Sequence, residues 1–110
     1  VIAESEEAAL QSARRAYPIW RKSFMTLWDL HDKDPIGIHY SETFDGIVET
    51  GQGIAGTPAQ VRDEIARQCD ESGVNYFVCR FAFGDLTLNE SGRSIKLFAE
   101  RVMPELSGLV

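Results

Sequence analysis

The residues best suited to chemistry follow an apolar run near position 80. Arg80 interrupts the stretch Val-Asn-Tyr-Phe-Val-Cys-Arg-Phe-Ala-Phe, and Gly84 and Asp85 come directly after it. If the run is a strand, these residues stand at its carboxyl end, where α/β barrels place their active sites. We therefore predict that Arg80, Phe81, Phe83, Gly84 and Asp85 line a substrate or cofactor pocket. The alternative is that the two phenylalanines are core residues and that Asp85 belongs to a turn.

A loose glycine cluster is a second candidate, for phosphate binding. Gly53, Gly56 and Thr57 could place backbone amides around an anion. The spacing differs from a P-loop and from a dinucleotide fingerprint, because no Lys-Ser/Thr pair follows and no convincing strand precedes it. A structural turn is the favoured interpretation of the cluster.

Other site chemistries find little support. His31 and His39 are the only side chains whose unperturbed pKa lies near neutrality, and neither stands at a recognisable spacing from a carboxylate or nucleophile. Cys69 and Cys79 form no C-x-x-C pair and have no neighbouring ligand group, which argues against a disulfide framework or a zinc site. We expect two reduced thiols and no metal.

The composition narrows the class of protein. The chain is 44% hydrophobic and 25% charged, which is ordinary for a globular protein. A net charge of -6 with scattered basic residues argues against a nucleic-acid partner. No apolar run approaches the roughly 20 residues that span a bilayer, and the sequence opens without a signal-peptide pattern. We therefore expect a cytoplasmic protein without a membrane partner.

Two capped helices flank the apolar run. Thr57, Pro58 and Gln60 predict a helix over 58–72 that Gly73 ends, and Thr87 with Glu90 predicts a last helix that Pro104 ends. Residues 74–83 predict a strand buried on both faces, and residues 1–3 predict the end of another. We therefore predict the C-terminal fragment of a (β/α)8 TIM barrel, mostly helical, with one long buried strand and a short N-terminal strand.

The N-terminal half predicts further helices. Ser5 should cap a helix that begins with acidic residues, and Pro18 should interrupt that helix. Aromatic residues at three- and four-residue steps then predict a second helix, and Ser41 could cap a short helix over 41–48. Residues 1–110 would thus be a single partial domain with a helical insertion at about 19–50.

Several segments together resemble the C-terminal end of the bacterial luciferase-like monooxygenases. They are Gly56-Thr57-Pro58-Ala59-Gln60-Val61, Gly73-Val74-Asn75-Tyr76-Phe77, Phe83-Gly84-Asp85, the run from Ser94 to Leu106, and Val1-Ile2-Ala3-Glu4-Ser5-Glu6-Glu7-Ala8, which is similar to the family's late "VAxTxEEA" segment. Each motif alone is weak, and their order and spacing are more specific.

The resemblance implies a flavin-dependent oxidoreductase. The cofactor would be reduced FMN, or alternatively the deazaflavin F420, and a small organic substrate would be oxidised, with oxygen in the FMN members. The chain would hold the last two strand-helix units, so it would be inactive alone, would not bind the flavin by itself, and would come from a homo-oligomer. Two other hypotheses stay open: a self-associating structural fragment, and a small α/β module that binds a phosphate ligand.

Overall fold

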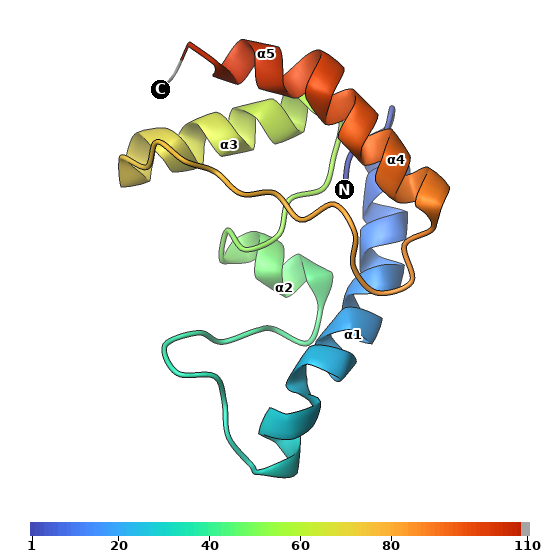
Figure 1. The fold of residues 1–110 in the computed structure, drawn as a ribbon, viewed down its shortest axis with the longest axis vertical. Coiled ribbons are helices and arrows are strands. Elements are labelled where there is room, and N and C mark those ends of the chain that lie inside the picture. Colours follow the sequence, from blue (N-terminus) through green and yellow to red (C-terminus); the bar gives the residue numbers. More distant parts are fainter. Residues whose placement is uncertain (109–110) are drawn as a thin grey trace.

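The computed structural model describes residues 1–108, and most of them are helical. The elements are α1 (Glu6–Leu30), α2 (Phe44–Glu49), α3 (Pro58–Ser72), α4 (Leu88–Leu97), the π-helical segment η1 (Phe98–Val102) and α5 (Met103–Leu106). Helix α3 lies beside the rod made by α4 and α5, whereas the C-terminal half of α1 extends away from both (Figure 1). The molecule is elongated and thin, measuring 44 × 32 × 18 Å.

The predicted barrel fragment, with its long buried strand and its short N-terminal strand, is wrong. Residues 1–108 contain no strand and no sheet. Residues 74–83 are extended but unpaired, and Val74, Tyr76 and Val78 are 47%, 83% and 78% exposed. Residues 1–3 make only an isolated parallel bridge, from Ile2 to Gly56. A strand buried on both faces needs a neighbour along each edge, and the described chain supplies neither.

The predicted helix starts at Thr57 and Thr87 are confirmed. Each threonine side chain accepts a hydrogen bond from the amide of the third helical residue, and the side-chain oxygen of Gln60 or Glu90 accepts one from the threonine amide. These capping boxes satisfy donors that have no partner within the helix. Helix α3 ends at Gly73 in the left-handed conformation, with a φ of 73°, as predicted.

Helix α1 begins as predicted but continues past its proline. Ser5 accepts a hydrogen bond from the Ala8 amide, and the helix then runs unbroken through Pro18 to Leu30. The prediction that Pro18 interrupts the helix is therefore wrong. Pro18 is exposed, and the burial of Tyr17 before it and of Met25 after it along α1 outweighs the one hydrogen bond that a proline removes.

The remaining helices differ from the prediction at their ends and in a π-helical segment within the last one. The short helix α2 is capped by Thr43 rather than by Ser41. Pro104 lies within α5 instead of ending the last helix, because it stands in the first turn after the π-helical segment, where its missing N–H removes little hydrogen bonding.

Two apolar clusters hold the chain together. One joins α1 to α2 through Ala13, Tyr17, Phe44 and Ile47. The other joins the N-terminal segment to α3 and η1, and its most buried members are Ile2, Val61, Ile65 and Val102. Segment 74–83 passes between the two clusters and contributes Phe81 to the second and Phe83 to the first.

A candidate functional cavity

A cavity of about 330 Å³ lies between the two clusters. Its walls come from α1, α2, the loop at 51–54, α3, η1 and segment 74–83, and they are mainly aromatic and aliphatic. The aromatic members are Tyr17, Trp20, Tyr40, Phe44, Phe77, Phe81, Phe83 and Phe98. A concave, mostly apolar space with few polar groups is typical of a site for a small organic molecule.

Aromatic contacts fix the walls on both sides of the cavity. Phe81 packs edge-on against Phe98 with ring centroids 5.2 Å apart. On the opposite side, Trp20 stacks on Phe24 at 5.0 Å, and Tyr40 packs edge-on against both rings. Such pairs add roughly 0.5–1.5 kcal/mol each beyond the burial of their area. The wall made by α1 is therefore held more firmly than the wall made by the extended segment.

Arg80 reaches the cavity as a cation over an aromatic ring. Its guanidinium carbon lies 5.6 Å from the centroid of the Trp20 ring. The side chain is thus neither buried nor paired with a carboxylate within residues 1–108, and its charge is stabilised by the ring. Arg80 places one positive charge at the rim of an otherwise apolar space.

Three of the five residues predicted to line a pocket do line this cavity. Arg80, Phe81 and Phe83 are in its wall, whereas Gly84 and Asp85 are not. Whether that cavity serves a flavin or a substrate stays a prediction.

Gly84 and Asp85 instead join the loop to α1. Gly84 has a φ of 58°, and a β-carbon there would lie 2.0 Å from the carbonyl oxygen of Ala16. Only glycine fits that approach. Asp85 accepts a hydrogen bond from Nε of Arg15 at 3.1 Å, and the two terminal nitrogens of Arg15 bind Glu90. These residues hold the end of segment 74–83 in place.

The glycine cluster offers no support for a phosphate cradle. The amide of Gly53 donates to Ile47, that of Gly56 donates to Val1, and that of Thr57 donates to Gln60. The Thr57 hydroxyl is engaged as the cap of α3. Gly53 lines the cavity, but all three amides already have partners, and an anion site would need them free.

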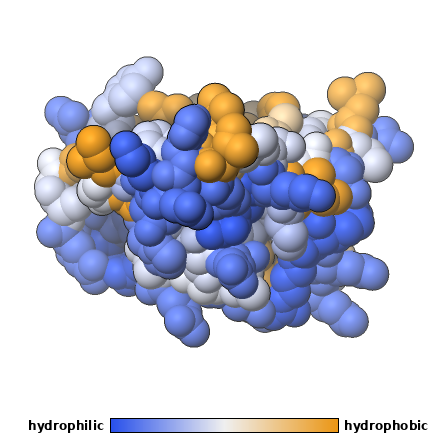
Figure 2. All heavy atoms as spheres, turned by 90° about the horizontal axis from the view of Figure 1, so that it is seen from below, coloured by the Kyte–Doolittle hydropathy of each residue, from blue (hydrophilic) through white to orange (hydrophobic). Residues whose placement is uncertain are grey.

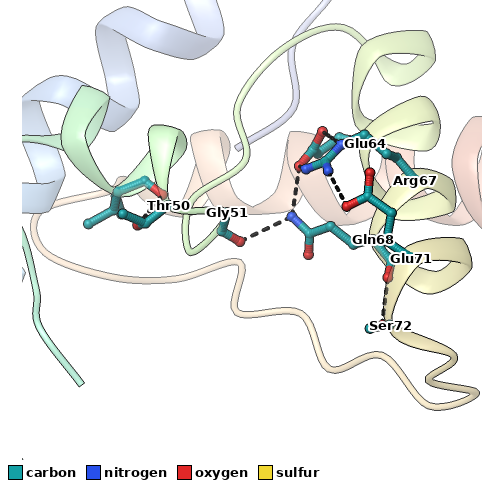
Figure 3. A network of polar contacts seen from close by, with 8 residues as sticks. Thr50, Gly51, Glu64, Arg67, Gln68, Glu71 and Ser72 are labelled. Carbon is teal, nitrogen blue, oxygen red and sulfur yellow. Dashed lines mark hydrogen bonds and ion pairs between the residues drawn. The ribbon is translucent and has the colours of Figure 1, made fainter. Parts of the chain in front are cut away.

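A polar network fixes the loop that forms the cavity floor. Gln68 on α3 donates its side-chain amide to the Gly51 carbonyl at 3.1 Å and to Glu64 at 2.8 Å (Figure 3). Arg67 binds Glu64 and Glu71, and this guanidinium, followed by Gln68, lowers the pKa of the Glu64 carboxyl. The loop at 51–54 is thus tied to a helix rather than left free.

The cavity contains no side chain that is poised as a base. Burial raises the pKa of the Tyr17 phenol, whose hydroxyl donates to the Ser41 carbonyl. Burial also raises the pKa of the Cys79 thiol. Both groups therefore stay protonated and neutral at neutral pH. The arrangement can bind, orient and dehydrate a ligand, and the two groups supply no anion for proton abstraction.

The histidines and the acidic residues add no second site. His31 and His39 are exposed and lie outside the cavity wall. Within residues 1–108, no group of three or more metal-type side chains is close enough to hold an ion. None of the helices in this described range combines the length and apolar content needed to cross a membrane.

The sequence did not point to the half of the wall that comes before residue 50. Tyr17, Trp20, Phe44 and Ile47 were recognisable as apolar helix positions, but no pattern showed that they would face Phe81. That juxtaposition depends on the turn at Gly84, which brings segment 74–83 back against α1.

Comparison with known proteins gives a relative without a known role. The chain is 38% identical over 91 residues to the "Uncharacterized protein y4wF" of Sinorhizobium fredii (strain NBRC 101917 / NGR234). The match covers 83% of this chain and 26% of the relative, so the chain spans about a quarter of that protein's length. No family model matches, and no solved structure is significantly similar.

Proposed function

We propose that this chain is part of a flavin-dependent oxidoreductase and forms an apolar wall of its ligand site. The observation that carries the proposal is the aromatic cavity of about 330 Å³, which Arg80, Phe81 and Phe83 help to line. Two of the motifs that resemble luciferase-like monooxygenases, Gly73-Val74-Asn75-Tyr76-Phe77 and Phe83-Gly84-Asp85, lie at the two ends of the segment that carries these residues. A cytoplasmic location and a homo-oligomeric state belong to this proposal.

The chemistry of the wall suits a planar ring system. A flavin presents a flat aromatic surface, and aromatic side chains bind such surfaces with little loss of conformational entropy. When bound, FMN or F420 would supply the redox chemistry, and the chain would contribute shape and exclusion of water. The neutral Tyr17 and Cys79 fit that role, since they leave the space free of buried negative charge.

The first test uses the longer related protein. Purified y4wF should carry a flavin-type absorption band, near about 450 nm for oxidised flavin, or acquire it on adding FMN. For F420 the corresponding test is co-purification of its fluorescence. A colourless protein that binds neither FMN nor F420 would contradict the proposal.

The second test uses this chain and two matched variants. The aromatic cavity replaces the expectation that the chain alone binds no flavin: titration with FMN, followed by flavin fluorescence, should show weak and saturable binding. We expect a Kd above about 10 μM, because the chain supplies only one part of the site. Phe81→Ala should weaken binding at least about fivefold, a loss of roughly 1 kcal/mol of aromatic contact. Tyr76→Ala should change nothing, since Tyr76 is 83% exposed and outside the wall. Equal effects of the two variants would count against the cavity as the site.

A further inference from the structure

The C-terminal half of α1 has an outer face that the described chain leaves uncovered. Ile19, Leu27 and Leu30 on this face are 46%, 67% and 71% exposed. With Ser23 and Thr26 they fall within an arc of roughly 100° on a helix of 3.6 residues per turn. We call these five residues the outer stripe. It is as wide as the apolar stripe by which a helix packs against a neighbour.

The opposite side of the same helix is already packed. Tyr17 and Met25 are each 2% exposed, and Trp20 stacks on Phe24. Figure 1 shows that this half of α1 extends beyond the other helices, with the segment at 31–43 beside it, and Arg80 of segment 74–83 lies over the Trp20 ring. Figure 2 views the molecule from this end and shows separate hydrophobic groups spread along one edge of the whole molecule, above a mostly hydrophilic body. A helix exposed to water on its outer side would be polar there, so the outer stripe calls for a partner.

The charges beside the outer stripe indicate what that partner is. Lys22 and Asp29 are seven residues apart, so they lie along the same edge of the stripe. Both are exposed, and neither forms an ion pair with another residue in the described range. The same edge on a second, antiparallel helix presents these charges in the opposite order, so each positive charge meets a negative one.

We propose that the outer stripe pairs with the outer stripe of a second copy of this chain, with the two helices antiparallel. In this register Ile19 of each copy packs on Leu30 of the other, and Ser23 packs on Thr26. Each Lys22 then faces Asp29 of the second copy. In a parallel pair this edge of one helix would face the opposite edge of the other, so Lys22 and Asp29 would lose their contact.

The centre of the proposed interface suits a close approach. Ser23 is small, and the Thr26 hydroxyl already donates to the Lys22 carbonyl at 2.7 Å, so its polar atom is satisfied within the helix. The stripe covers about 16 Å of helix, at 1.5 Å per residue. An interface this short is smaller than a standard stable one, and we expect a dimer with a dissociation constant in the micromolar range.

Exchange of the two charges tests the proposal sharply. Lys22→Asp leaves two negative charges on the edge, and Asp29→Lys leaves two positive charges, so each variant alone should be monomeric. A 1:1 mixture of the two restores both opposite-charge contacts and should form a heterodimer. Sedimentation velocity should therefore give 12.3 kDa for each variant and twice that mass for the mixture and for the unchanged chain.

Control variants distinguish an effect of the two edge charges from an effect of net charge and from a loss of folding. Lys96→Asp and Glu49→Lys make the same charge changes at exposed positions outside the stripe and should leave dimerisation unchanged. Leu27→Asp should give a monomer with unchanged far-UV circular dichroism, because Leu27 is exposed in the single chain.

Three results would overturn the proposal. One is an unchanged chain that stays monomeric at every concentration up to about 1 mM, well above the expected constant. Another is association that persists in Leu27→Asp, which would place the contact elsewhere on this chain, for example on segment 74–83. The last is a mixture of the two charge variants that stays monomeric.

Discussion

Two extended segments of this chain have similar apolar sequences and opposite environments. Residues 1–3 are 9%, 1% and 1% exposed, whereas Val74, Tyr76 and Val78 in segment 74–83 are 47% to 83% exposed. The first segment exchanges backbone hydrogen bonds with Gly56, and Ser94 binds Ile2 at 2.9 Å. Amides 75–82 donate no hydrogen bond to any residue within 1–108.

The difference shows that apolar composition alone does not bury a segment. An extended chain can enter a protein interior only if its amides and carbonyls find partners there, since each unsatisfied group costs about 1–3 kcal/mol. Residues 1–3 have the bridge to Gly56 and the serine of α4. Segment 74–83 has packing along one side only, so it stays at the surface and forms a wall of the cavity.

Gly84→Ala should disrupt the contact between segment 74–83 and α1 and should lower the free energy of unfolding more than any other substitution considered below. Gly84 anchors the end of segment 74–83 on α1, and a β-carbon would meet the Ala16 carbonyl at 2.0 Å in a left-handed backbone. The combined strain and overpacking should lower the free energy of unfolding by about 3 kcal/mol. Urea denaturation followed by circular dichroism measures it.

The matched control for this glycine is Gly92→Ala on α4. Nothing lies within 4 Å of a β-carbon at Gly92, so the variant should gain up to about 1 kcal/mol of helix propensity. A loss below about 0.5 kcal/mol in Gly84→Ala would show that the loop does not close against α1 as described.

Ser94→Ala should have the next largest effect, and it acts on the other segment. The Ser94 hydroxyl accepts from the Ile2 amide and donates to the Ile2 carbonyl, and both residues are 1% exposed. Its loss leaves a buried amide without a partner and should cost about 2 kcal/mol in a urea titration. Ser107→Ala removes an exposed hydroxyl and should stay within about 0.5 kcal/mol. Similar losses in the free energy of unfolding for both serine variants would contradict a role of the Ser94–Ile2 hydrogen bonds in burying residues 1–3.

Glu90→Gln should give a smaller, pH-dependent effect. Arg15, followed by Ser12 and the Thr87 amide, holds the pKa of the Glu90 carboxyl well below its ordinary value. A carboxyl whose pKa is lower in the folded state stabilises the fold fully at a pH above its unfolded-state pKa. This stabilisation is lost as the pH falls through the folded-state pKa. We expect a cost of about 1–2 kcal/mol at pH 7 that shrinks towards pH 3.

The control for this carboxylate is Glu100→Gln, at an exposed position without an ion pair in the described range. Its free energy of unfolding should follow that of the unchanged chain at both pH values. A cost of Glu90→Gln that is equal at pH 7 and pH 3 would mean that charge is not the source of the contact between α1 and α4.

Local signals in the sequence predicted the helix ends well. Thr57, Gln60 and Gly73 act through atoms no more than a few residues away, so their chemistry is visible in a short window. The Pro18 prediction failed because the tertiary packing of Tyr17 and Met25 outweighs one lost hydrogen bond.

Non-local partners explain the larger errors. Residues 74–83 carry the composition of a buried strand, and nothing in that composition states whether another strand is available to pair with it. The cavity depends in the same way on the meeting of Phe81 with Phe98 and of Arg80 with Trp20, which are distant in sequence. The apolar residues were thus identified, and their neighbours were not.

Hydrogen exchange should show the difference between residues 1–3 and segment 74–83 in the unchanged chain. Amides 76–82 should exchange at nearly the rates of an unfolded peptide, because they donate no hydrogen bond within the described chain and their opening costs almost no free energy. The amides of Ile2 and Ala3 should be protected, since they donate to Ser94 and Gly56. If a ligand occupies the cavity, or if the chain pairs through this segment, protection should rise at 76–82 and not at Ile2. Protection at 76–82 in the dilute, ligand-free chain would mean that these amides have hydrogen-bond partners, which would contradict an unpaired wall of the cavity.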